Sequence, residues 1–158
     1  MKRLLIIGSV ALFVLACGGS GENESKTSET SEPDTPTENG NPSYDANRGE
    51  GKFDDVKLST TLDAAMAEKG EKVADLKCLS CHKTTDEKLV GPGWKGVTIR
   101  NKPEWIMNFI TNTDAMIDKD PKVQAMLEIC MVRMPNQSLS DEDARSLLEF
   151  MRKIDGVK

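Results

Sequence analysis

The 158-residue sequence is poor in aromatic side chains, in histidine and in net positive charge. It contains one tyrosine, two tryptophans and four phenylalanines, so a core built from side chains alone would be thin for this length. The formal net charge of −5 argues against a nucleic-acid-binding protein, because such proteins usually present a basic patch on a basic background. Charged residues make up 30% of the chain, which excludes a protein embedded in a membrane along its whole length.

The main hydrophobic run is too short to cross a membrane. It covers residues 4–15 after a basic start, whereas a spanning helix needs roughly 20 apolar residues. This pattern predicts an export signal peptide over residues 1–16. The run ends in Val-Leu-Ala-Cys, which resembles the lipobox of bacterial lipoproteins, in which the cysteine, here Cys17, is lipidated and becomes the new N-terminus. The alternative is an ordinary secretory signal that ends near a cysteine by chance.

Residues 17–51 have the composition of a disordered, lipid-anchored tether. They are rich in Gly, Ser, Thr, Glu, Asn and Pro, and they contain almost nothing apolar apart from Tyr44 and Ala46. Such a segment cannot bury enough apolar surface to offset the entropy lost on ordering. Eight acidic residues and two basic ones lie between positions 18 and 50, so the acidity of the chain belongs mainly to the tether. We therefore predict a folded domain over residues 52–158.

The remaining hundred or so residues predict short helices. Thr60 or Thr61 is expected to cap a helix that runs to about Lys77. Pro103 and Pro121 each open a further helix, because proline is favoured at the first helical position. The apolar residues expected along one face of the first helix are Leu62, Met66, Val73 and Leu76.

The last predicted helix has the clearest pattern. Ser140, with Asp143 three places later, is a signal for the start of a helix. No run of residues alternates convincingly between apolar and polar side chains, so no sheet is expected. The fold class is therefore predicted to be all-α. The apolar stripe of this last helix comprises Ala144, Leu147, Leu148, Met151 and Ile154.

The motif that carries chemistry is Cys78-Leu79-Ser80-Cys81-His82, which has the form C-x-x-C-H and predicts covalent attachment of a c-type haem. Two thiols on one helical turn can each add to a haem vinyl group, and the adjacent His82 can offer a ring nitrogen to the iron. A redox C-x-x-C pair would call for a βαβ context, which is lacking. A zinc site would need four ligands, and Cys130 is the remaining obvious soft ligand. The predicted export signal agrees with haem attachment, because haem is attached to such proteins outside the cytoplasm.

His82 is the only histidine, so two histidines cannot ligate the iron within one chain. The sixth position is then left to a methionine, to another donor such as lysine, to water, or open. A His–Met pair is the arrangement of electron-transfer cytochromes. Among eight methionines we favour Met134, because the following Pro135 breaks helix and holds an extended loop; Met131 is the next candidate. Cys130 is expected to be a buried free thiol, with a thiolate ligand or an intermolecular disulfide as alternatives.

Residues 60–155 resemble a class I (monohaem) cytochrome c. The resemblance implies an all-α cytochrome c fold, with three to five short helices around one covalently bound haem. The pieces that carry it occur in the family's order: Gly70, the haem motif, Val90-Gly91-Pro92, a helix with Trp105, Met134-Pro135, and Leu139 to Asp143 at the start of the last helix.

The resemblance also implies roles for single residues. Pro92 would offer its carbonyl group to the second ring nitrogen of His82, which orients a metal-bound imidazole and strengthens it as a donor. Gly70 would let the first and last helices cross closely, and Phe150 would pack near that crossing. Arg100 and Trp105 are weaker candidates for contacts with the haem propionates.

These observations predict a one-electron carrier in a respiratory chain, not an enzyme, with Cys78 and Cys81 as anchors and His82 and Met134 as axial ligands. Its partners would be redox protein donors and acceptors, with no small-molecule substrate and no nucleic acid. The domain would lie on the periplasmic or extracytoplasmic side of a bacterial membrane. The alternatives are an electron-entry subunit of a membrane oxidase or nitrogen-oxide reductase complex, and a haem sensor or enzyme with an open sixth site. Lysines that flank the haem motif, and that could steer acidic partners, are Lys77, Lys83, Lys88 and Lys95.

Overall fold

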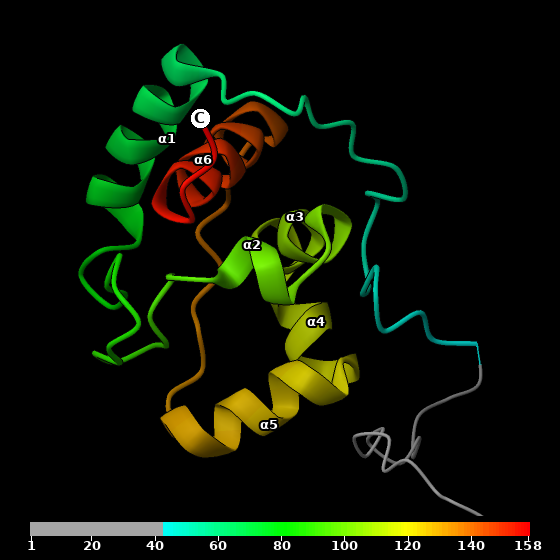
Figure 1. Cartoon of the computed structure of the whole chain (residues 1–158). Helices are drawn as coiled ribbons and strands as arrows, with labels where there is room; N and C mark the ends of the chain where they lie inside the picture. The colour runs from blue at the N-terminus through cyan, green and yellow to red at the C-terminus, as the bar shows by residue number, and fades with distance from the viewer. Residues whose placement is uncertain (1–42) are drawn as a thin grey trace, which may run out of the picture. The chain divides into compact units, whose positions relative to one another are not determined.

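The computed structural model describes residues 43–158, so the predicted signal peptide of residues 1–16, Cys17 and most of the predicted tether lie outside the described residues. This part of the chain contains helices and no strands, which confirms the all-α fold class (Figure 1). None of its helices is long and apolar enough to cross a membrane. The helices are α1 (Ala64–Lys77), α2 (Val97–Arg100), α3 (Pro103–Thr111), α4 (Thr113–Lys119), α5 (Pro121–Cys130) and α6 (Asp141–Ile154).

The described residues thus form six helices where three to five were expected. The two that the sequence pattern did not predict are short: α2 has 4 residues and α4 has 7. A helix of one or two turns is too short to show a hydrophobic period. In addition, only Asn112 separates α4 from α3, so the two read as one apolar stretch in the sequence.

The helix starts follow local hydrogen bonds. Ser140 caps α6 as predicted, because its side chain accepts a hydrogen bond from the backbone N–H of Asp143. The prediction that Thr60 or Thr61 caps α1 is wrong, since the helix begins later and Asp63 is its cap. The Asp63 carboxylate accepts from the backbone N–H of Met66 at 2.9 Å. Either kind of side chain can satisfy the free N–H groups of a first turn, so the sequence alone did not decide between them.

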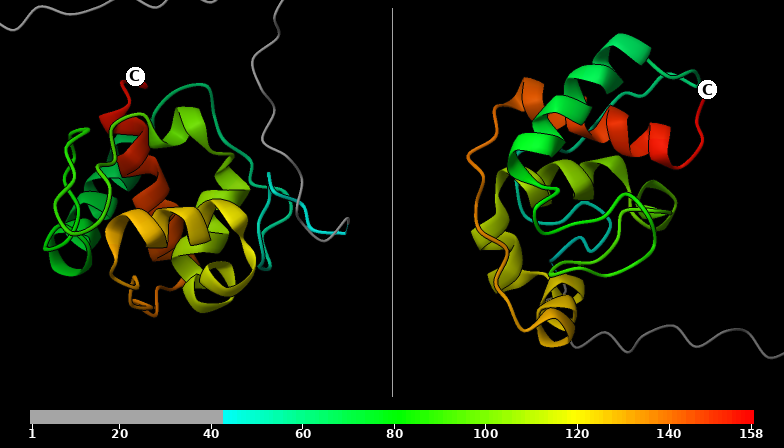
Figure 2. Two further views of the ribbon diagram at one scale, coloured as in Figure 1. Left: turned by 90° about the horizontal axis from the view of Figure 1, so that it is seen from below. Right: turned by 90° about the vertical axis from the view of Figure 1, so that its left-hand side faces the viewer.

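Helices α1 and α6 pack against each other (Figures 1 and 2). A Cβ atom on Gly70 would lie 2.5 Å from the carbonyl carbon of Ser146, so only glycine fits at this point and the role expected for Gly70 is confirmed. The apolar face predicted for α1 is wrong at Leu76, which is 85% exposed, whereas Leu62, Met66 and Val73 are half-buried. The buried residues of α1 are instead Ala67, Gly70 and Ala74, since a close crossing leaves no room for larger side chains.

The predicted stripe of α6 supplies much of the core. Ala144, Leu147, Leu148 and Met151 are buried, and Ile154 packs partly against the same cluster. Helix α3 contributes a second group of buried side chains that includes Trp105 and Ile106. Both helices contribute to one hydrophobic core cluster, which also includes Cys78 of the predicted haem motif.

The end of the predicted tether is part of the folded domain, which corrects the boundary drawn between residues 51 and 52. We call residues 43–58 the N-terminal strap. The side chain of Asn108, which is fully buried, donates to the carbonyls of Arg48 and Phe53 and accepts from the Phe53 N–H at 2.8–2.9 Å. Asn112 donates to the Glu50 carbonyl at 3.0 Å. Residues 43–51 of the strap are mostly polar, and amide side chains of α3 and its C-terminal cap satisfy some of their backbone groups. Farther along the strap, Phe53, Val56 and Leu58 pack against the core.

Candidate functional site

The haem motif begins where α1 ends. Cys78 is the cap of the helix, and the backbone N–H groups of Cys81 and His82 both bond to its carbonyl oxygen at 3.0 Å. This tight turn presents the two cysteines from one end of the helix. Both are free thiols; Cys78 is buried and Cys81 is half-buried. Burial raises the pKa of the Cys78 thiol to about 11.

The ring of His82 is held by the loop that follows. Its Nδ1 atom lies 2.8 Å from the carbonyl oxygen of Pro92, so the structure brings these two predicted site residues together. A carbonyl can only accept, so Nδ1 carries the proton and Nε2 keeps its lone pair. Burial lowers the pKa of His82, and the Pro92 carbonyl opposes that effect only in part. The neutral imidazole that results is the form that binds a metal.

Gly91 is required for this loop. A Cβ atom at this position would lie 2.8 Å from Nδ1 of His82, closer than real Cβ contacts come. The loop is closed by the backbone N–H groups of Val90 and Gly91, which donate to the carbonyl of Cys81 at 3.2 and 2.8 Å. The backbone at positions 90–92 is thus folded directly against the imidazole ring.

Trp94 is a residue of this site that sequence reasoning missed. It is buried, and its ring centroid lies 5.5 Å from that of His82 with the planes tilted by 32°. Phe150, on α6, packs edge-on against Trp94, with the two ring centroids 6.4 Å apart. Trp94 therefore links the histidine to the core. Nothing in the sequence marks it apart from its position two residues after Pro92.

The structure does not support Trp105 as a propionate ligand. Its single donor, the indole N–H, bonds to the carboxylate of Asp120 at 2.8 Å, and Trp105 is itself buried. Arg100 is exposed and donates one N–H to the Lys95 carbonyl at 2.8 Å. Asp120 was not predicted; it also accepts from Tyr44 of the strap at 2.7 Å and caps α5 through the Val123 N–H.

The two methionine candidates differ in their surroundings. Met134 is half-buried and packs against the apolar core. Met131 ends α5 in a left-handed conformation with φ of 55°, and its side chain is exposed. Cys130, at the end of α5, is a half-buried free thiol. Only Met134 of the two is therefore directed toward the interior.

The four lysines that flank the motif all have partners within the chain. Lys83 pairs with Glu87 at 2.6 Å. The other three donate to backbone carbonyls: Lys77 to Gln137, Lys88 to Ile129 and Lys95 to Ile154, at 2.7–2.9 Å. These bonds join the segments around the motif to α5, α6 and the segment between them.

The residues present fit a covalently attached haem. Two free thiols stand at the spacing required for two thioether bonds, and His82 offers Nε2 beside them. Large apolar side chains at Leu89, Val90, Ile129 and Val132 are exposed, and the bond from Lys88 to Ile129 brings their two segments together. An apolar macrocycle held by this motif would cover exposed apolar side chains of this kind. Within residues 43–158 no cluster of three or more His, Cys, Asp or Glu side chains is placed to hold a metal ion.

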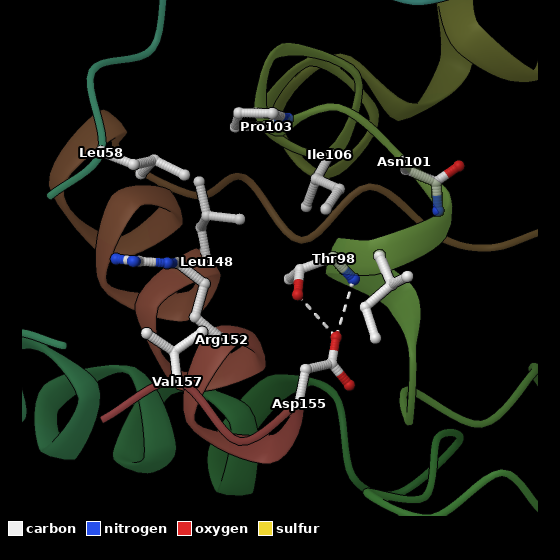
Figure 3. A pocket seen from close by; sticks show the side chains of 10 residues that line it. Leu58, Thr98, Asn101, Pro103, Ile106, Leu148, Arg152, Asp155 and Val157 are labelled. Carbon is white, nitrogen blue, oxygen red and sulfur yellow. Dashed lines mark hydrogen bonds between the residues drawn. The ribbon is translucent and has the colours of Figure 1, made fainter. Parts of the chain in front are cut away.

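A separate pocket of about 230 Å³ lies at the C-terminal end of α6 (Figure 3). Leu58, Ile106 and Leu148 supply apolar walls, and Asp155 accepts hydrogen bonds from the N–H and the hydroxyl of Thr98 at 2.8 and 2.6 Å. None of its lining residues belongs to the predicted haem site. This pocket is therefore distinct from the centre built around His82.

Comparison with known proteins identifies the family independently of the geometry of the site. The family model for cytochrome c matches residues 67–155. A solved cytochrome c from Rhodothermus marinus is similar, with 34% sequence identity and a TM-score of 0.64 over 66% of this chain and 90% of that chain. An engineered cytochrome c from the same organism, described as bound to a carbene intermediate, has 33% identity and a TM-score of 0.61 over the same shares. A comparison with curated protein sequences finds no match. The chain belongs to the cytochrome c family and is an electron-transfer protein with covalently bound haem c and its iron.

Proposed function

We propose that this protein is a one-electron carrier of a respiratory chain, with its haem attached through Cys78 and Cys81 and its iron ligated by His82 and Met134. The observation that carries this proposal is the 2.8 Å contact between Nδ1 of His82 and the Pro92 carbonyl. It leaves Nε2 of a neutral imidazole free beside two free thiols. The half-buried Met134, which packs against the core, supports the choice of sixth ligand.

The residues of the chain tune and enclose the group that they hold. When bound, the haem supplies an iron that gains and loses one electron reversibly. The Pro92 carbonyl fixes the orientation of His82 and increases its donor strength. The thioether of Met134 would raise the reduction potential of the bound haem and would keep other ligands from its iron. Because no substrate bond is made or broken, the function is that of a carrier and not of an enzyme.

The proposal includes a lipid anchor at Cys17 that tethers the domain to the extracytoplasmic side of a bacterial membrane. Its electron donors and acceptors would then be redox proteins at the same surface. A Cys17→Ala variant is expected to appear in the soluble extracytoplasmic fraction, because it lacks the acyl chains that stable anchoring needs. Fractionation with detection of the haem measures this, and wild-type protein in the same fraction would contradict the anchor.

The sixth ligand is tested by a visible spectrum of the exported protein, oxidised and reduced, with and without carbon monoxide. A weak far-red band of sulfur bound to ferric iron, unchanged spectra under carbon monoxide and a low-spin state are expected. A high-spin spectrum that shifts at once with carbon monoxide would support the second candidate, a haem sensor or enzyme with an open site. The relative described as bound to a carbene intermediate favours keeping that candidate in the test. Co-purification with a complex in detergent would indicate an electron-entry subunit.

A Met134→Ala variant is expected to fold with its haem but to lose the far-red band and to bind carbon monoxide rapidly, because the sixth ligand has been removed. Met131→Ala is the matched control, since Met131 lies three residues earlier and is exposed. It should keep the wild-type spectrum. Retention of the band in the Met134 variant, or its loss in the Met131 variant, would contradict the assignment.

A further inference from the structure

Arg133, the residue next to Met134, is tied to α4 by two carboxylates. Its Nη2 atom lies 3.2 Å from Oδ1 of Asp114 and 3.1 Å from Oδ1 of Asp118, and its Nη1 atom lies 3.2 Å from the same Asp118 oxygen. Asp114 and Asp118 are four residues apart on α4, so they lie on one face of that helix. The guanidinium therefore bridges the segment that carries the proposed sixth ligand to a helix on another part of the chain.

Helix α4 is a firm anchor for this bridge. Met116 and Ile117 are buried in the core, on a helix that also meets the N-terminal strap. Lys119 pairs with Glu50 of the strap at 3.1 Å, and Asn112, the residue before the helix, donates to the Glu50 carbonyl. Helix α4 is thus held both by the core and by the strap, so a tie to α4 can restrain a segment that has no helical structure of its own.

The segment of residues 132–138 has few other ties. It lies between α5 and α6 without helical structure, and its internal hydrogen bonds, from Gln137 to Pro135 and from Ser138 to Asn136, are local. In the described part of the chain, the polar contacts that leave this segment are those of Arg133 and the bond from Lys77 to the Gln137 carbonyl. Arg133 is the tie nearest to Met134 and acts from its N-terminal side.

We propose that Arg133 is a positioning residue that holds Met134 at the iron by fixing its segment against α4. The inference rests on the proposed His–Met ligation. An external ligand that competes with Met134 must displace this segment, so its apparent affinity depends on how firmly the segment is held. The ion pairs are exposed, with the Arg133 side chain at 48% accessibility. Each such pair contributes little to global stability, but the effect is concentrated on one loop.

The test is competition by imidazole in the haem-loaded ferric protein, followed by the loss of the far-red sulfur–iron band. Arg133→Gln is expected to bind imidazole about three- to tenfold more tightly than the wild type, the effect of one or two exposed ion pairs. Asp114→Asn/Asp118→Asn should shift the affinity in the same direction, and adding Arg133→Gln to that pair should change it little further. Arg133→Lys should restore part of the wild-type behaviour. High salt should reduce the difference in imidazole affinity between the wild type and Arg133→Gln, because it screens exposed ion pairs.

Glu71→Gln is the matched control. It removes an ion pair with Lys153 at 2.9 Å, between α1 and α6, in which both side chains are 46% exposed. It should leave imidazole affinity unchanged. Equal affinities for the wild type and Arg133→Gln, or an equal shift in Glu71→Gln, would overturn the inference while leaving the wild-type band, and with it the proposed function, intact. Absence of the band from the wild type itself would instead overturn the proposed ligation and this inference together.

Discussion

A Gly70→Ala variant is expected to lose about 3 kcal/mol or more of its free energy of unfolding. The added Cβ would lie 2.5 Å from the backbone carbonyl carbon of Ser146, and a backbone atom can retreat only if α1 and α6 separate. Because their crossing buries Ala67 and Ala74, separation would open cavities along the whole contact. Urea unfolding of the haem-loaded protein measures the loss, provided that the wild type and the variant have the same dependence of unfolding free energy on urea concentration.

Alanine has a higher helix propensity than glycine, which by itself would stabilise α1 by roughly 0.5–1 kcal/mol. The sign of the result therefore separates packing from propensity. Glu68→Ala is the control, since Glu68 lies exposed on the same helix, and it should stay within about 0.5 kcal/mol of the wild type. A Gly70→Ala protein as stable as the wild type would show that the helices do not cross this closely.

A Glu149→Ala variant is expected to be destabilised by about 3–5 kcal/mol, because it leaves a buried cation without its partner. Glu149 is fully buried on α6. Its carboxylate accepts from Arg152 at 2.6 Å, from Arg145 at 2.7 Å and from the backbone N–H of Asp63 at 2.9 Å. Since Asp63 caps α1, this carboxylate also ties the start of α1 to α6.

Ionisation of the same carboxylate makes the free energy of unfolding depend on pH. Burial by itself raises the pKa of Glu149, but the hydrogen bonds from Arg152, Asp63 and Arg145 outweigh it and hold the pKa below its usual value of 4.5. A group whose pKa is lower in the folded state stabilises the fold above its unfolded pKa. That contribution is lost as the pH falls through the folded pKa. The difference in stability between the wild type and Glu149→Ala should therefore be full near neutral pH and shrink below about pH 4.5.

The cost of Arg145→Gln provides a comparison with the cost of Glu149→Ala. Arg145 reaches the same carboxylate but is partly exposed, whereas the side chain of Arg152 is only 7% exposed. Water can replace an exposed donor, so Arg145→Gln should cost less than Glu149→Ala. Unfolding curves at several pH values provide both measurements. A constant difference between the wild type and Glu149→Ala from pH 7 to pH 3 would show that the ionised carboxylate is not the stabilising form.

Much of the proposed haem site could be proposed from the sequence because its parts lie close together along the chain. The two cysteines and His82 occupy five consecutive residues, and the cap of α6 depends on Ser140 and Asp143 alone. Pro92 is ten residues from His82, and its place at the imidazole followed from the family resemblance. Trp94 was missed because nothing local shows that an indole two residues later would lie against the same ring.

The N-terminal strap shows why composition failed elsewhere. Its first part, residues 43–51, belongs to the segment whose polar composition predicts disorder, since that segment has too little apolar surface to fold alone. The backbone carbonyls of Arg48 and Glu50 instead accept hydrogen bonds from Asn108 and Asn112, which are 60 and 62 residues away. The apolar pattern of α1 failed for a similar reason, because the face that is buried depends on how closely Ser146 of α6 approaches Gly70.

From the sequence alone follow the all-α class, the prediction of covalent haem attachment at Cys78 and Cys81, and a single histidine as a candidate ligand. These depend on short spacings, on helix-start signals and on how many histidines the chain has. The tertiary structure alone decided which face of α1 is buried, where the folded domain begins, and which of Met131 and Met134 faces the core. The physical reason is that burial and hydrogen-bond satisfaction are properties of pairs of residues, and the deciding partners lie far apart along the chain.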